Sequence, residues 1–181
     1  MRVITGSARG CRLKELEGME TRPTTDRVKE GLFNIIQFDI EGRKILDLFA
    51  GTGQLGIECL SRGAKSVTFV DQSRDAIKLI RENLAHCQMQ GEVVQADSIG
   101  FIGRDGKYDI ILIDPPYDTD LMDKALEKIT AFDILNDGGI IVCESRLDKT
   151  VKELPAPYYV EKERKYGKIK VTICGKREAE A

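Results

Sequence analysis

The chain has 181 residues, of which 41% are hydrophobic and 32% charged, and its formal net charge is −2. This length suits one domain with a substantial core and is too short for two ordinary domains. No apolar run approaches the roughly 20 residues that a membrane helix needs, and the N-terminus lacks the apolar core of a signal peptide. We therefore expect one cytosolic domain that makes no contact with a membrane.

Two elements are predicted before the repeating part of the chain. Residues 1–16 indicate two short strands around a glycine-containing turn. Residues 22–36 indicate a helix entered through Pro23, with Thr24 or Thr25 as its N-cap. The apolar residues of this helix are spaced to lie on one side, and they are Val28, Leu32, Ile35 and Ile36.

From Lys44 onward, short apolar runs alternate with longer amphipathic segments. The runs predict strands at residues 44–49, 66–71, 92–97, 108–114 and 139–145. The amphipathic segments predict helices at residues 53–63, 73–87 and 119–132. Such alternation is typical of a parallel, doubly wound α/β sheet with helices on both faces.

The last predicted elements are antiparallel. Pro155 and Pro157 break any helix, and residues 158–174 then indicate a β-hairpin that turns near Gly167. The predicted sheet is thus seven-stranded and mostly parallel, with an antiparallel C-terminal hairpin. We expect an N-terminal hairpin extension at residues 1–21, the main domain at 22–175 and a frayed tail at 176–181.

The number and spacing of the cysteines argue against a disulfide-stabilised or zinc-binding fold. There are five, an odd number, and they are widely spaced with only His86 to join them. We therefore expect neither a disulfide framework nor a metal site. We expect the cysteines to be buried free thiols. The cysteines are Cys11, Cys59, Cys87, Cys143 and Cys174.

A glycine-rich loop follows the first predicted strand. Gly51, Gly53 and Gly56 in DLFAGTGQLG satisfy G-x-G-x-x-G, which lets the backbone approach a ligand at the start of a helix. Asp71 follows at about the spacing of the ribose-binding acid in a dinucleotide site. A nicotinamide-dependent dehydrogenase, or a nucleotide-binding module without catalysis, is therefore one alternative.

Three acids favour a different ligand. Asp47, Asp71 and Asp97 lie at the carboxyl ends of three successive predicted strands, so they surround a ligand with a positive group, a ribose and a base. S-adenosylmethionine has these three parts, whereas a carboxylate at Asp47 suits a pyrophosphate poorly. A dehydrogenase would also need an acid–base group and a substrate domain, for which no length remains. The competing interpretation is that Asp47 and Asp97 only cap helices or turns.

The fourth predicted strand ends in the corner LIDPPYD. Its two prolines fix φ and remove N–H donors, which leaves a constrained group of acceptors beside the Asp114 carboxylate. Such a group suits an NH₂, and Tyr117 offers a flat face on which a base can stack. The alternative is a rigid turn with a capping acid and a packed tyrosine.

These residues resemble a known family. DPPY after an apolar strand is similar to the corner of S-adenosylmethionine-dependent amino methyltransferases. Together with RPTTDRVKEGLFN (22–34), ILDLFAGTGQLGIECLSRGA (45–64) and RKYG (164–167), it resembles the bacterial 16S ribosomal RNA guanine-N2 methyltransferases. The resemblance implies a Rossmann-like class I methyltransferase fold. It also implies methyl transfer from S-adenosylmethionine to a guanine amine, with S-adenosylhomocysteine as the product.

The resemblance assigns roles to single residues. It implies that Asp114 and the Pro115 carbonyl hold the amine, Pro116 stiffens the corner and Tyr117 stacks on the base, without a metal. Thr24 is expected to close over the methionine part of the cofactor or to cap the helix. The implied cofactor contacts are Asp47, Ala50, Gly51, Gly53, Asp71 (ribose), Gln72, and Asp97 with Ser98 (adenine).

The basic residues gather at the two ends of the chain, and the middle is acidic. We expect them to bind the phosphates of ribosomal RNA or of an assembling small subunit, unless they are merely solvated charges. The expected contacts are Arg2, Arg9, Arg12, Lys14, Arg22 and Arg27, and then Arg164, Lys165 and Lys168. An amine methyltransferase for DNA or a protein amide stays an alternative, and the chain is expected to be a monomer.

Overall fold

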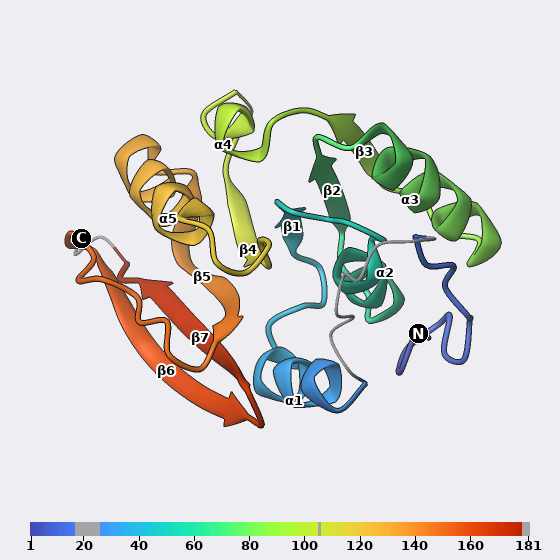
Figure 1. The fold of residues 1–181 in the computed structure, drawn as a ribbon, viewed down its shortest axis with the longest axis horizontal. Helices are drawn as coiled ribbons and strands as arrows, with labels where there is room; N and C mark the ends of the chain where they lie inside the picture. The colour runs from blue at the N-terminus through green and yellow to red at the C-terminus, as the bar shows by residue number, and fades with distance from the viewer. Residues whose placement is uncertain (17–25, 105, 179–181) are drawn as a thin grey trace.

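The computed structural model describes residues 1–16, 26–104 and 106–178. Within these ranges a seven-stranded sheet alternates along the chain with helices (Figure 1). The strands are β1 (Lys44–Asp47), β2 (Ser66–Asp71), β3 (Glu92–Gln95), β4 (Tyr108–Ile113), β5 (Leu135–Arg146), β6 (Tyr158–Tyr166) and β7 (Ile169–Lys176). The helices are α1 (Asp26–Ile36), α2 (Gln54–Ser61), α3 (Arg74–His86), α4 (Ser98–Phe101) and α5 (Leu121–Phe132).

The strand order is β3-β2-β1-β4-β5-β7-β6. Strands β1 to β5 pair in parallel, whereas β7 pairs antiparallel with both β5 and β6. The chain runs outward from β1 to β3 and then crosses back to β4 on the other side of β1. This reversal of strand order is the place where doubly wound sheets bind ligands. The predicted sheet, doubly wound and mostly parallel with seven strands and an antiparallel C-terminal hairpin, is confirmed.

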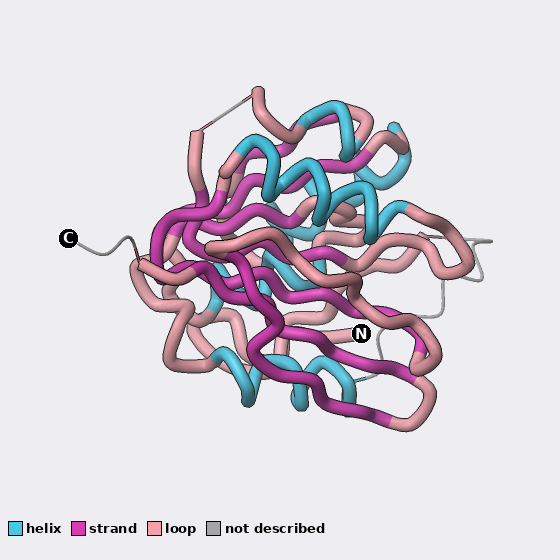
Figure 2. The backbone as a smooth tube through the Cα atoms, turned by 90° about the vertical axis from the view of Figure 1, so that its left-hand side faces the viewer, coloured by secondary structure: helices cyan, strands magenta, loops and turns pink. Residues whose placement is uncertain are grey.

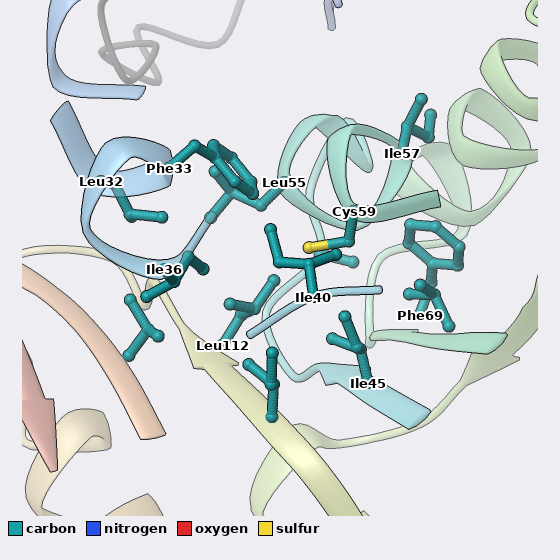
Figure 3. Close-up of a cluster of buried hydrophobic side chains, with 14 of the residues drawn as sticks. Leu32, Phe33, Ile36, Ile40, Ile45, Leu55, Ile57, Cys59, Phe69 and Leu112 are labelled. Carbon is teal, nitrogen blue, oxygen red and sulfur yellow. The ribbon is translucent and has the colours of Figure 1, made fainter. Parts of the chain in front are cut away.

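Helices cover both faces of the sheet, and Figure 2 shows the strands between them. One apolar cluster joins the sheet to α1, α2 and α3, and a second joins it to α4 and α5. Leu32 and Phe33 of α1 and Leu55 of α2 belong to the same buried cluster as the strand residues Ile45 and Leu112 (Figure 3). Burying each such side chain contributes about 1.5–3 kcal/mol. The central strands are apolar on both faces because both are covered.

Several predicted boundaries differ from those observed. The strand at residues 66–71 is confirmed at both ends, while those predicted at 44–49 and 92–97 end two residues early, at Asp47 and Gln95. Helix α4 was not predicted, since it is a single turn whose cap is the Asp97 carboxylate. β5 begins at Leu135, earlier than predicted. The prediction missed this start because NDGG has the composition of a turn, although this segment belongs to the strand.

The N-terminal segment folds back on itself as predicted but forms less regular structure. Its pairing is a single antiparallel bridge between Arg2 and Arg12, and no strand of several residues is formed there. The predicted helix start, including Thr24, lies outside the described residues. At the other end, β7 continues to Lys176, one residue into the predicted tail, and this lysine is buried. The predicted division into three parts stays a prediction.

The expectation that all cysteines are free was wrong for one pair. Cys11 and Cys87 form a disulfide across 76 residues of sequence. The N-terminal segment packs against the end of α3, a tertiary contact that cysteine spacing cannot reveal. Cys59, Cys143 and Cys174 are free and buried, as expected. In the described part of the chain, no group of His, Cys, Asp and Glu is placed to hold a metal, and no helix is long and apolar enough to cross a membrane.

Candidate functional site

The candidate site lies at the carboxyl edge of the sheet, where the loop after β1 meets the corner after β4. Asp47 of β1 is the register partner of Leu112 of β4, and the Leu48 amide donates to the Leu112 carbonyl at 3.1 Å. The glycine loop therefore begins beside the strand that carries residues 114–117. The expectation that these two motifs share one edge of the sheet is confirmed.

The glycine loop is a tight turn that the carboxylate of β2 organises. Gly51 and Gly53 have backbone φ angles of 55° and 80°, which residues other than glycine rarely adopt. The Ala50 amide donates to the Val70 carbonyl at 3.0 Å. One Asp71 oxygen accepts from the Gly51 amide at 3.0 Å, and the other accepts from the Ser73 amide at 2.8 Å. Asp71 thus holds the loop from the position predicted to bind a ribose.

Asp47 is a buried carboxyl group under the start of α2. Its side chain accepts from the Gly56 amide at 3.0 Å, and only 2% of the residue is exposed. Burial is the main cause that raises the pKa of Asp47 to about 7; the Gly56 hydrogen bond lowers this pKa and the nearby charge of Asp71 raises it. A cationic ligand would stabilise this buried group, because a nearby positive charge favours the ionised form of a carboxyl group.

Asp97 and Ser98 start α4 at the end of the third parallel strand. The Asp97 carboxylate caps this helix by accepting from the Gly100 amide at 2.6 Å, as the alternative interpretation expected. Ser98 is buried, and Gln72 is exposed after β2 with its carbonyl accepting from Gln95 at 3.3 Å. These residues lie at the same sheet edge as the glycine loop, on the side of β2 and β3.

The corner after β4 adjoins a pocket of about 190 Å³ lined by residues 115–119 and 144–146 among others. The Tyr117 hydroxyl donates to the Glu144 carboxylate at 3.0 Å, and Glu144 is 2% exposed. Arg146 and Asp118 form an ion pair at 3.0 Å that joins the corner to the end of β5. Glu144 and Arg146 were not among the predicted site residues, although an acid that ends an apolar strand was the signal used at Asp47.

A larger cavity, of about 1070 Å³, lies elsewhere, between α5 and residues 152–158. None of the predicted site residues that the structure describes lines it. Three of its charged residues pair with one another, since Lys176 lies 2.8 Å from both Asp133 and Asp137. The small pocket at the corner is therefore the better candidate for a binding site.

The predicted RNA-binding residues in the described part of the chain are all exposed. Two of them have acidic partners, because Arg2 lies 3.7 Å from Asp26 and Lys14 lies 3.0 Å from Glu82. Arg22 lies outside the described residues. The exposed set comprises Arg2, Arg9, Arg12, Lys14, Arg27, Arg164, Lys165 and Lys168.

The two basic segments are joined through α1 and β6. Tyr166, at the end of β6, lies so close to Gly31 of α1 that a side-chain carbon at position 31 would overlap its ring. This contact connects two of the motifs on which the family resemblance depends, residues 22–34 and 164–167. It places α1, with Arg27, beside the hairpin that carries Arg164 and Lys165.

A family model, curated relatives and solved structures all match this chain over nearly its full length. The family model "Conserved hypothetical protein 95" matches residues 1–175. The chain is 37% identical to "Putative rRNA methyltransferase YlbH" of Bacillus subtilis, covering 98% of this chain and 100% of the relative. It is 32% identical to "Ribosomal RNA small subunit methyltransferase D" of Escherichia coli, covering 93% and 86%. The solved structure "Putative methyltransferase yhhF from Escherichia coli" aligns with a TM-score of 0.89 at 28% identity, over 99% of both chains.

Proposed function

Because the chain belongs to the conserved hypothetical protein 95 family, we propose that it methylates the exocyclic N2 amine of a guanine in small-subunit ribosomal RNA. S-adenosylmethionine is the proposed methyl donor. One observation carries the proposal: the corner at residues 114–117 follows β4, directly beside the β1 strand that leads into the glycine loop. An acceptor group for an amine and a loop for a nucleotide therefore share one sheet edge.

The residues of the glycine edge fit the cofactor. Asp47 is a buried carboxyl group whose raised pKa makes a positively charged partner favourable. The Asp71 carboxylate is positioned at the end of β2, where a ribose binds in folds of this class. When bound, S-adenosylmethionine supplies a methyl group on a sulfonium and leaves as S-adenosylhomocysteine. The protein's part is to bind and orient both partners of this transfer.

The corner supplies the chemistry on the acceptor side. The lone pair of the guanine amine is delocalised into the ring, which makes the nitrogen a poor nucleophile. In the proposed mechanism the Asp114 carboxylate and the Pro115 carbonyl accept hydrogen bonds from the two N–H groups of the amine, so that the lone pair turns toward the methyl carbon. A bond forms between nitrogen and that carbon, the carbon–sulfur bond breaks, and the nitrogen loses a proton to Asp114 or to solvent. Tyr117 stacks on the base and holds it in register.

The basic residues at the two ends are proposed to bind the RNA backbone. Phosphate contacts give affinity that falls with salt, while selectivity comes from RNA shape and the base pocket. We propose that the protein acts as a monomer in the cytosol on ribosomal RNA or an assembling small subunit. RNA affinity that is equal at low and high salt would contradict the proposed interface.

An acceptor panel tests the proposal. The protein is incubated with methyl-labelled S-adenosylmethionine and, separately, with unmodified 16S ribosomal RNA, small subunits, DNA and protein. Label in RNA or small subunits alone is the expected result. Label only in DNA or protein would favour the alternative amine methyltransferases. A thermal-shift comparison of S-adenosylmethionine with nicotinamide dinucleotides separates the dehydrogenase alternative, because a ligand of the folded state stabilises it.

A further inference from the structure

The N-terminal arm, residues 1–14, packs against the two helices that flank the glycine loop. On one side it binds α2, because the Ile4 and Thr5 amides donate to the buried Glu58 carboxylate at 2.9 and 3.0 Å. On the other side it binds α3, through Lys14 and through the disulfide between Cys11 and Cys87. The arm, which carries Arg9 and Arg12, is thus an integral part of the domain.

One side chain connects the arm directly to the loop. Asn83 of α3 is fully buried, and its oxygen accepts from the Lys14 amide at 2.8 Å. Its nitrogen donates to the Lys14 carbonyl at 3.2 Å and to the Thr52 carbonyl at 2.9 Å. Thr52 lies between the two loop glycines, Gly51 and Gly53. The same amide group therefore binds the backbone of the arm and the backbone of the glycine loop.

These three hydrogen bonds restrict how the two segments can move. A buried amide left without partners costs free energy, so Asn83 favours the arrangement in which both segments are docked. A second arm-to-loop contact lies nearby, where the Thr52 hydroxyl is 3.5 Å from the Met1 sulfur. A loop ordered by its ligand should therefore also favour the docked arm, and the reverse should hold equally.

We propose that Asn83 is a positioning residue that couples cofactor binding at the glycine loop to RNA binding by the N-terminal arm. The inference rests on the proposed function and deepens it, because it makes the two substrates bind cooperatively. S-adenosylhomocysteine raises the affinity for 16S ribosomal RNA, and the RNA raises the affinity for S-adenosylhomocysteine by the same factor. Since Asn83 faces backbone groups of this chain, its contribution is to the arrangement of the site.

The test measures this coupling factor by titration calorimetry. Affinity for S-adenosylhomocysteine is measured with and without an unmodified 16S ribosomal RNA transcript, under reducing conditions so that the disulfide does not hold the arm. Asn83→Asp keeps the acceptor for the Lys14 amide and removes both donors. Asn34→Asp, the same change at an exposed position of α1, is the matched control.

We expect coupling of about fivefold or more in the wild type and in Asn34→Asp, falling toward onefold in Asn83→Asp. Equal coupling in all three proteins, or none in the wild type, would overturn the inference. Hydrogen exchange on the wild type is a second readout that needs no variant. S-adenosylhomocysteine should slow exchange of the Lys14 amide together with the loop amides, and slowing confined to the loop would contradict the inference.

The inference and the proposed function can fail separately. Methyl transfer to ribosomal RNA is measured on the same wild-type preparation. Transfer without coupling would reject the role of Asn83 and leave the function in place. Absence of transfer to RNA would reject the function, while the exchange of the Lys14 amide would still decide whether cofactor binding reaches the arm.

Discussion

The Tyr117 hydroxyl donates a hydrogen bond to the buried Glu144 carboxylate at 3.0 Å. Tyr117 belongs to the corner after β4, and Glu144 lies near the end of β5. The bond therefore fixes the aromatic ring proposed to stack on the base against a neighbouring strand. The ring's position depends on two strands of the sheet as well as on its own loop.

Substitutions at Tyr117 should separate stacking from orientation. Tyr117→Ala removes the ring and should cost about 1–3 kcal/mol of stacking, measured as reduced kcat/KM for the RNA. Tyr117→Phe keeps the ring, removes one hydrogen bond and should cost about 1 kcal/mol. Glu144→Gln keeps an acceptor for the hydroxyl and serves as the control. If Tyr117→Ala and wild type had equal kcat/KM, the ring would not contact the base.

The pKa of Asp47 predicts how stability changes with pH. This pKa is raised from 3.8 in the unfolded chain to about 7 in the folded protein. Between these two pH values the folded protein keeps a proton on Asp47 that the unfolded chain has lost. The contribution of Asp47 to folding stability is thus fully present below about pH 4 and is lost as pH rises through 7. Denaturant titrations from pH 5 to 8 measure the free energy of unfolding of wild type and Asp47→Asn. As the pH rises, the free energy of unfolding of the wild type should fall relative to that of the variant. A difference that does not change over this range would contradict the raised pKa.

The same group predicts how cofactor binding changes with pH. S-adenosylmethionine carries positive charge and should favour ionised Asp47, so its affinity should rise as pH increases through about 7. Calorimetry at several pH values measures this, and the rise should be smaller in Asp47→Asn. Binding that is equally pH-dependent in both proteins would place the titrating group elsewhere.

The contact between Gly31 and Tyr166 predicts a large effect from one methyl group. Gly31→Ala would overlap the Tyr166 ring, and this overpacking should cost about 1–3 kcal/mol, of which the higher helix propensity of alanine offsets about 1 kcal/mol. Chemical denaturation measures the loss, and Glu30→Ala at the adjacent exposed position is the control. Combining Gly31→Ala with Tyr166→Ala should lessen the additional cost of the glycine substitution. Gly31→Ala with wild-type stability would show that the ring moves aside freely.

The disulfide predicts a stability that depends on the redox state. Reduction of Cys11–Cys87 should lower the free energy of unfolding by about 2–4 kcal/mol, since the bond closes a long loop in the unfolded chain. Denaturation with and without a reductant measures the change, and a variant with serine at both positions should show none. Equal stability of the oxidised and reduced wild type would contradict this prediction.

The sequence was most informative where structure depends on neighbours in the chain. The alternating strands and helices, the glycine loop and the position of Asp114 to Tyr117 all follow from local patterns, and the sheet order then brings them together. Glu144, Asn83 and the Cys11–Cys87 pair were missed because their partners lie far away in sequence. The start of β5 was missed because Gly138 and Gly139 have the composition of a turn within a segment that pairs with β4. Arg22 and Thr24 keep their roles as predictions, since they lie outside the described residues.

The most direct test of the central claim is the identity of the methylated nucleoside. Unmodified 16S ribosomal RNA is incubated with saturating S-adenosylmethionine and either wild type or Asp114→Ala, then digested to nucleosides and analysed by mass spectrometry. We predict N2-methylguanosine with the wild type and a loss of at least about tenfold in its rate of formation with Asp114→Ala, as expected when a charged hydrogen-bond partner is removed. A methyl group on another atom, or wild-type transfer by Asp114→Ala, would contradict the account.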